Sequence, residues 1–301
     1  MRVAFAKSFL TVAARDPRVI FLTGDLGFNA FEPLQRRLKD RFINAGVAEH
    51  NMVTAAAGLA YTGLQPWVYS IAPFVTIKVV EEIRNDICLQ GANVKIVGLG
   101  GGYDYGLAGP THHALQDVAA ILSLPNIKVY APGFAQDVAA IVKKMHREKT
   151  PAYLRLTKGQ PTDLRLPPYA PSRRIAKGAK MTVVALGSIA KPICELVAQK
   201  AVPSGAIDLW VVSELPQELP PQLLGSIRKT KTLMVVEEHV KTGGLGQWVT
   251  NTLVERRVPV SRYIHLYAKG YTTKRYGSHE FYLRQTGLDK GSIARTLRRS
   301  L

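Results

Sequence analysis

Glu49 is the residue whose type and position most directly suggest chemistry. It lies in NAGVAEHNM, residues 44–52, between a small-residue turn and an apolar run that continues through Val53 and Leu59. A helix that begins here would bury the carboxyl group, and carboxylates are almost never fully buried without a partner. Burial in an apolar site would also raise the pKa of Glu49. The pattern predicts either a helix-capping carboxylate or one that shares a proton with a ligand.

A second candidate site is the glycine-rich stretch GLGGGYDYGLAGPTHH, residues 98–113, which ends on His112 and His113. No Gly-Lys-Ser or Gly-Lys-Thr follows it, as a phosphate-binding P-loop requires. Pro110 stands where a dinucleotide-binding loop would begin a helix. The stretch is either a plain mobile loop or a loop that presents polar groups at the carboxyl edge of a sheet, where α/β proteins bind ligands.

Other catalytic motifs give little support. GGLGQW, residues 243–248, is either a phosphate loop or a tight turn that lets a helix pack closely on a sheet. The sequence contains no Gly-x-Ser-x-Gly element and no His-Glu-x-x-His motif, which excludes the commonest serine and zinc hydrolase patterns. Cys88 and Cys194 lie far apart without metal-ligand spacing, so we expect no metal site, no disulfide and a reducing, cytoplasmic location.

The formal net charge of +18 is evidence about partners rather than about fold. It fits a solvated basic surface, an acidic partner chain or an anionic substrate. Basic and aromatic residues do not interleave as in a nucleic-acid-binding module, so we expect no nucleic acid partner. No apolar stretch approaches the ~18 residues that span a bilayer, and Lys7, Arg15 and Asp16 interrupt the apolar N-terminus, so we expect neither a membrane span nor a secretion signal.

These candidate residues need a scaffold, and the periodicity of the first half predicts one. Strand-like runs alternate with helical patterns, which is typical of an α/β fold with a parallel sheet covered on both faces. The expected helices cover 5–15, 31–40, 49–62, 73–90 and 115–123, and the expected strands cover 19–25, 41–46, 66–71, 94–100 and 127–132.

A proline-rich stretch interrupts this alternation, and the pattern restarts beyond it. We therefore expect two domains, at residues 1–160 and 175–301, joined by a linker at 161–174. The strands expected in the second domain cover 181–187, 206–212, 232–238 and 260–268.

The motifs resemble those of the transketolase family. GVAEHNM resembles the Gly-Ile-(Ala/Arg)-Glu-(Gln/His) motif of its pyrimidine-binding domain, and two further segments, EEIRNDICLQGANVKIVG and GPTHHALQDVAAILSLPNIKVYAPG, also match that domain in order. VVEEHVKTGGLGQWV resembles the transketolase C-terminal domain, and the tail GSHEFYLRQTGLDKGSIARTL is similar to 1-deoxyxylulose-5-phosphate synthases. The resemblance covers nearly the whole chain and implies two parallel-type sheet domains.

The resemblance also implies a partner. Family members have a further domain that binds the diphosphate of thiamine diphosphate through a divalent metal, and its Gly-Asp-Gly…Asn motif is absent here. We therefore expect the chain to be the C-terminal subunit of a split transketolase-like enzyme. The diphosphate domain and the ligands of Mg²⁺ or Ca²⁺ would lie on an N-terminal subunit, in an α2β2 heterotetramer.

By the same resemblance, Glu49 hydrogen-bonds the aminopyrimidine ring nitrogen of thiamine diphosphate and controls its proton. Phe74 stacks on that ring, with Ile71 and Ile77 at positions that are often aromatic in the family. Leu26 matches a cofactor-contacting position, although a pure core role for the positions at 71, 74 and 77 stays open.

The resemblance places His112 at the carbonyl and hydroxyl groups of the substrate, whereas His113 replaces a common glutamine and receives no role. Asn29, Gly100 and Lys158 stand where the family commonly has a serine, a histidine and an arginine that bind the sugar phosphate. Lysine meets phosphate only as a point charge. We therefore expect a basic pocket poor in phosphate ligands, and a modified or nucleotide-linked sugar as acceptor.

Three alternative functions stay open. The chain could be the β subunit of a 2-oxo acid dehydrogenase, which has the same two-domain layout. It could catalyse a decarboxylating condensation as 1-deoxyxylulose-5-phosphate synthases do, or it could be a non-catalytic scaffold that kept the fold.

Overall fold

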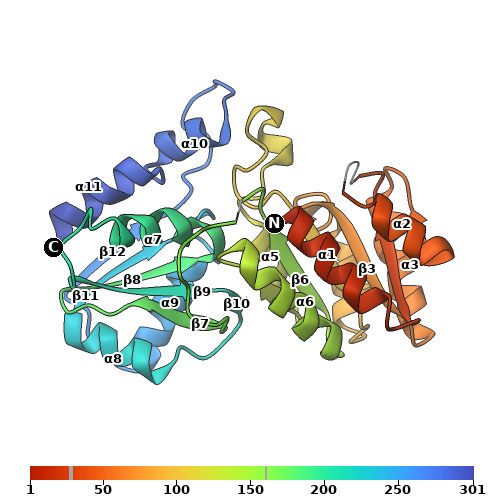
Figure 1. Cartoon of the computed structure of the whole chain (residues 1–301), viewed down its shortest axis with the longest axis horizontal. Helices are drawn as coiled ribbons and strands as arrows, with labels where there is room; N and C mark the ends of the chain where they lie inside the picture. Colours follow the sequence, from red (N-terminus) through yellow and green to blue (C-terminus); the bar gives the residue numbers. More distant parts are fainter. Residues whose placement is uncertain (27–29, 160) are drawn as a thin grey trace.

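A computed structural model describes residues 1–26, 30–159 and 161–301 of the chain. Two α/β halves lie side by side in it, each built around its own sheet (Figure 1). Both sheets consist largely of parallel strands with helices around them, so the α/β fold expected from the sequence is confirmed.

Within the described residues, the first sheet has seven strands in the order β10-β5-β6-β4-β3-β1-β2. All neighbours pair in parallel except β10, which is antiparallel to β5. The strands are β1 (Val19–Thr23), β2 (Phe42–Asn44), β3 (Gln65–Ile71), β4 (Lys95–Leu99), β5 (Lys128–Tyr130), β6 (Ala152–Leu156) and β10 (Glu214–Leu215).

Helices cover both faces of this sheet, which is why its central strands are buried along their whole length. Trp67 and Tyr69 of β3 pack in one core cluster with Phe5 of α1, whereas Val68 packs in another with Met52 of α3. The main helices are α1 (Arg2–Ala13), α2 (Glu32–Leu38), α3 (Glu49–Tyr61), α5 (Asp117–Leu122) and α6 (Val138–Arg147).

The helix expected over 73–90 is broken into three short pieces. Residues 73–76 form turns, and the 3-10 helix η2 (Ile77–Val79), the α-helical turn α4 (Val80–Glu82) and the π-helix η3 (Ile83–Cys88) follow. Thr76 donates a hydrogen bond from Oγ1 to the carbonyl of Ala72, 2.6 Å away, which favours a turn over continued helix. The expectation of one helix is wrong, and the irregular backbone places Lys78 near the start of α3.

The second half has a five-stranded sheet in the order β12-β11-β8-β9-β7, in which only β7 runs antiparallel among the described strands. Its strands are β7 (Ser172–Ala176), β8 (Met181–Leu186), β9 (Ile207–Val212), β11 (Thr232–Val236) and β12 (Arg262–Leu266). The helices are α7 (Ala190–Ala198), α8 (Pro221–Thr230), α9 (Leu245–Glu255), α10 (His279–Thr286) and α11 (Lys290–Ser300).

The two halves share structure at their junction. Strand β10 lies beyond β9 in the chain but pairs with β5 of the first sheet. One core cluster contains Val129 of the first sheet together with Val212 and Val235 of the second. Strand β7 begins inside the stretch expected to be a linker. In the part of the chain that the structure describes, no helix has the length and apolar character needed to cross a membrane.

Candidate functional site

The candidate site lies at the carboxyl edge of the first sheet, where β1, β3, β4 and β6 end side by side. Parallel strands bring their following loops to the same edge, and this edge is the usual ligand site of α/β proteins. The loops that follow these strands begin at Gly24, Ala72, Gly100 and Thr157.

Glu49 is the first residue of α3, and its side chain is only 2% exposed. Its Oε1 accepts a hydrogen bond from Ser70 Oγ at 3.0 Å, and its Oε2 lies 2.8 Å from Lys78 Nζ. The helix N-cap is Ala48, so the carboxylate of Glu49 is directed to other elements, β3 and η2. A buried carboxylate with two polar partners is the arrangement that burial of a charge requires.

The pKa of Glu49 moves in the direction opposite to the one expected. Burial raises it, as the sequence suggested, but hydrogen bonds from Lys78 and Ser70 outweigh burial and lower the pKa below its usual value. The free chain therefore holds Glu49 ionised. The expectation of a raised pKa is wrong because it left out a lysine 29 residues further along the chain.

Aromatic and basic side chains continue from Glu49 along this edge. The Phe74 ring is 5.1 Å from the His112 ring, and the His112 ring is 5.9 Å from that of Tyr105. Lys158 Nζ lies 4.1 Å from the centroid of the Tyr105 ring. We call Phe74, His112, Tyr105 and Lys158 the site row. It joins the loops after β3, β4 and β6.

A pocket of about 590 Å³ opens beside the end of this row. Lys158 and Tyr105 line it together with Arg2 and Lys7 of α1. The sequence predicted a pocket poor in phosphate ligands, but α1 adds two cations to Lys158. The pocket is therefore suited to an anionic group, because three basic side chains surround one cavity.

The other sequence-predicted residues are placed differently. Ile71 is buried at the end of β3, whereas the Ile77 side chain is 39% exposed on η2. Leu26 lines a smaller pocket beside Asn44. Asn29 lies outside the described residues.

Gly100 serves the shape of the loop. Its φ is +93°, and a Cβ there would lie 2.2 Å from the Tyr105 ring. Gly100 therefore leaves the room in which Tyr105 packs.

Residues of the second half hold the glycine-rich loop in place. Glu238 Oε1 accepts the backbone N–H of Tyr103 at 2.7 Å and pairs with His279 Nε2 at 2.8 Å. The Tyr103 hydroxyl donates to the carbonyl of Gly270. The loop that ends on His112 is thus anchored from the other half of the chain.

His113 is part of this anchor. It is 3% exposed, its Nε2 lies 3.0 Å from the carbonyl oxygen of Gly106, and its Nδ1 lies 3.1 Å from the Tyr271 hydroxyl. Burial lowers the pKa of His113, which favours the neutral ring. Its contacts give His113 a packing role beside the half-buried His112.

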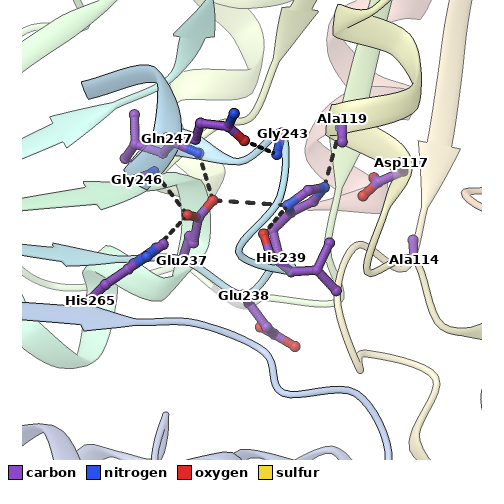
Figure 2. A network of polar contacts seen from close by, with 12 residues as sticks. Ala114, Asp117, Ala119, Glu237, Glu238, His239, Gly243, Gly246, Gln247 and His265 are labelled. Atoms are coloured by element: carbon purple, nitrogen blue, oxygen red, sulfur yellow. Dashed lines mark hydrogen bonds and ion pairs between the residues drawn. The ribbon is translucent and has the colours of Figure 1, made fainter. Parts of the chain in front are cut away.

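The GGLGQW stretch forms a tight turn before α9. Glu237 accepts the backbone N–H groups of Leu245 and Gly246 and lies 2.7 Å from His265 Nε2, as Figure 2 shows. The helix N-terminus that could have bound phosphate is therefore filled by the chain's own carboxylate. Of the two alternatives drawn from the sequence, the structure supports the turn.

Sequence reasoning missed several residues of the site: Arg2, Lys7, Ser70, Lys78, Tyr105 and Glu238. A polar Ser70 inside an otherwise apolar strand was the one local signal. The rest are brought to the site by packing between elements distant in sequence. Among the described residues, no group of three His, Cys, Asp or Glu side chains could hold a metal ion.

The model of the family "Transketolase, pyrimidine binding domain" matches residues 1–162. One of the two subunits of an apulose-4-phosphate transketolase from Actinobacillus succinogenes is 30% identical over 173 residues, which are 56% of this chain and 56% of that protein. The 1-deoxy-D-xylulose-5-phosphate synthase of Clostridium perfringens is 25% identical over 215 residues, which are 69% of this chain and 34% of that protein. The chain thus spans about half or less of the length of these relatives.

A solved structure described as "Split gene transketolase, inactive beta4 tetramer" is similar over the whole chain. It covers 100% of this chain and 97% of its own, with 28% sequence identity and a TM-score of 0.84. The similarity extends through both halves, beyond the residues that the family model matches.

Proposed function

The chain belongs to the transketolase family, and we propose that it is the C-terminal subunit of a split, thiamine-diphosphate-dependent transketolase-like enzyme. It would transfer a two-carbon ketol unit to an aldose acceptor. The observation that carries this proposal is the buried Glu49 carboxylate, which lies at the same sheet edge as Phe74 and His112.

The residues present fit the coenzyme. A buried carboxylate beside a half-buried aromatic ring suits a ligand ring that offers both a nitrogen and a π-face. When bound, thiamine diphosphate supplies the nucleophilic carbon that accepts the two-carbon unit. Glu49 would hold the proton at the pyrimidine nitrogen, Ser70 would orient Glu49, and Phe74 would stack on the ring.

His112 and the basic pocket would act on the sugar. The His112 ring is half-buried between Phe74 and Tyr105, where it can donate a proton to a developing oxygen anion. Arg2, Lys7 and Lys158 would bind an anionic group at the far end of the acceptor. We propose an acceptor that carries such a group, and a modified sugar in preference to an ordinary pentose phosphate.

We further propose a partner subunit that carries the diphosphate-binding domain and the ligands for Mg²⁺ or Ca²⁺. The assembly would be an α2β2 heterotetramer in the cytoplasm. The solved structure described as an inactive tetramer of β chains supports the idea that this chain alone is inactive.

Reconstitution tests this function. The chain is purified with a subunit that carries the diphosphate motif, and thiamine diphosphate and Mg²⁺ are added. We expect ketol transfer to a modified anionic aldose with the complex, and none with either subunit alone. Full activity with xylulose 5-phosphate and ribose 5-phosphate would overturn the acceptor class, and no transfer to any aldose would overturn the proposed reaction.

A decarboxylating condensation is the second candidate, because a 1-deoxy-D-xylulose-5-phosphate synthase matches 69% of this chain. The same reconstituted complex is therefore assayed with pyruvate. Release of carbon dioxide with formation of a condensation product would favour this candidate over ketol transfer.

A further inference from the structure

Both oxygens of the Glu49 carboxylate are already occupied in the free chain. Ser70 Oγ lies 3.0 Å from Oε1, and Lys78 Nζ lies 2.8 Å from Oε2. A further donor that arrives at Glu49 must share an oxygen with one of these groups or replace it. Ser70 belongs to a buried strand, whereas the Lys78 side chain is 41% exposed on a short 3-10 turn. Lys78 is therefore the partner that can move.

Lys78 also lies next to the ring that is proposed to stack on the coenzyme. Its Nζ is 5.8 Å from the centroid of Phe74, so one ammonium group lies close to both Glu49 and Phe74. These are the two side chains that would contact the same pyrimidine ring.

The other charges around Glu49 have partners of their own. His50, the next residue of α3, pairs with Glu82 of α4, and Asp25 after β1 accepts a hydrogen bond from Asn44. Lys78 is thus the cation that neutralises Glu49 among the described residues.

The ion pair creates a proton deficit at the site. An unprotonated ring nitrogen and an ionised carboxylate are both hydrogen-bond acceptors, so they repel each other unless one proton lies between them. Lys78 holds Glu49 in the ionised form, and this proton is absent from the free chain.

From these contacts we propose that Lys78 is the resident counter-ion of Glu49 and is displaced when the coenzyme's pyrimidine ring binds. The inference rests on the proposed function. In the balance we expect, one proton enters from solvent and is shared between Glu49 and the ring nitrogen. Lys78 keeps its three protons and turns towards solvent. Lys78 is therefore a positioning residue that sets the charge of Glu49 before the coenzyme arrives.

The first test uses the free chain. The carboxyl carbon of Glu49 is followed by ¹³C NMR against pH, with Glu49→Gln to assign its signal. We expect Lys78→Met to raise the pKa of Glu49, because burial then acts without a compensating cation. Lys78→Arg keeps the charge and should titrate as the wild type does. Lys143→Met, at an exposed position of α6, is the matched control. An unchanged Glu49 titration in Lys78→Met would overturn the proposal.

The second test uses the reconstituted complex and thiamine diphosphate. Calorimetry in two buffers of different ionisation enthalpy measures proton uptake. We expect about one proton taken up by the wild type and by Lys78→Arg, and close to none by Lys78→Met. The Lys78→Met complex should bind the coenzyme at least about tenfold more tightly, since each pKa unit of Glu49 corresponds to a factor of about ten.

The outcomes separate the two proposals. If the wild-type complex binds no thiamine diphosphate, both the proposed function and the role of Lys78 fail. If it binds without proton uptake, or if Lys78→Met matches the wild type in affinity and uptake, only the role of Lys78 fails.

Discussion

At the scale of single residues, the candidate site depends on one buried carboxylate whose charge is controlled by neighbours. Ser70 orients Glu49, and Lys78 keeps it ionised. Gly24 belongs to the same arrangement, because a Cβ there would lie 3.4 Å from Glu49 Oε1 and 3.5 Å from Ser70 Oγ. The site therefore combines a fixed carboxylate with a movable counter-ion.

Substitution of Glu49 tests the proposed proton control. We expect Glu49→Gln to lower kcat of the reconstituted enzyme by roughly 10²–10⁴, the usual range for loss of a general acid–base group. Glutamine keeps the side-chain shape but cannot exchange the proton. Glu81→Gln, at an exposed position of α4, should leave kcat unchanged. A purified Glu49→Gln enzyme with near-wild-type turnover would contradict the assigned role.

At the scale of secondary-structure elements, α10 and the glycine-rich loop form one unit. The Glu238–His279 pair joins the start of α10 to the N–H of Tyr103, and Tyr103 and Tyr282 stack with ring centroids 5.1 Å apart. The position of His112 therefore depends on the C-terminal half. Figure 1 shows this connection as the extended segments that meet between the two sheets.

This unit predicts a pH-dependent stability. Burial disfavours the charged form of His279, but the Glu238 carboxylate outweighs burial and raises the pKa of His279 to about 9. The contribution of this pair is complete below the unfolded-state pKa of about 6.5 and is lost as pH rises through about 9. We expect on the order of 1–2 kcal/mol, reduced by solvent screening because the side chain is 38% exposed.

Urea denaturation at pH 6.5, 8 and 9.5 measures this effect. The wild type should lose stability over this range more steeply than His279→Gln, because only the wild type releases this proton. The comparison removes the contribution of other groups that titrate in the same range. Equal pH slopes for the two proteins would contradict the assignment.

At the scale of the whole molecule, a buried charged network connects the two halves. Arg155 of β6 donates to Asp117 Oδ2 at 2.8 Å and to the backbone carbonyls of Ala114 and Glu238 at 3.0 Å. His239 Nε2 accepts the N–H of Ala119 at 3.2 Å, and Figure 2 shows this contact across the junction. Together with β10 and the shared core cluster, these contacts predict that the halves unfold together.

Calorimetric unfolding of the wild type should therefore show one transition. Asp117→Ala leaves the Arg155 charge buried without its partner, which typically costs about 3–5 kcal/mol. We expect Tm to fall by on the order of 10 °C, with both halves still melting together. Asp163→Ala, at an exposed position, is the control. Two separate transitions, or a shift in only part of the heat signal, would contradict the single-unit prediction.

Local patterns were sufficient for part of this description. Alternating buried strands and helices predicted the α/β fold because periodicity depends on neighbouring residues. The position of Glu49 at the start of a helix, and of His112 after a glycine-rich loop, also followed from short motifs. The elements at 138–156 were not assigned, although α6 and β6 lie there.

Contacts between distant segments could not be read in this way. Lys78 meets Glu49 only because the chain breaks the helix expected over 73–90, and Glu238 reaches Tyr103 across 135 residues. The cations of α1 join Lys158 because their elements end at one edge of the sheet.

The amino-acid order alone therefore specified the kinds of element and the residues able to exchange protons. The charge of Glu49, the anchoring of the His112 loop and the union of the two halves depend on three-dimensional packing, because electrostatic and hydrogen-bond energies are set by distance in space and by burial.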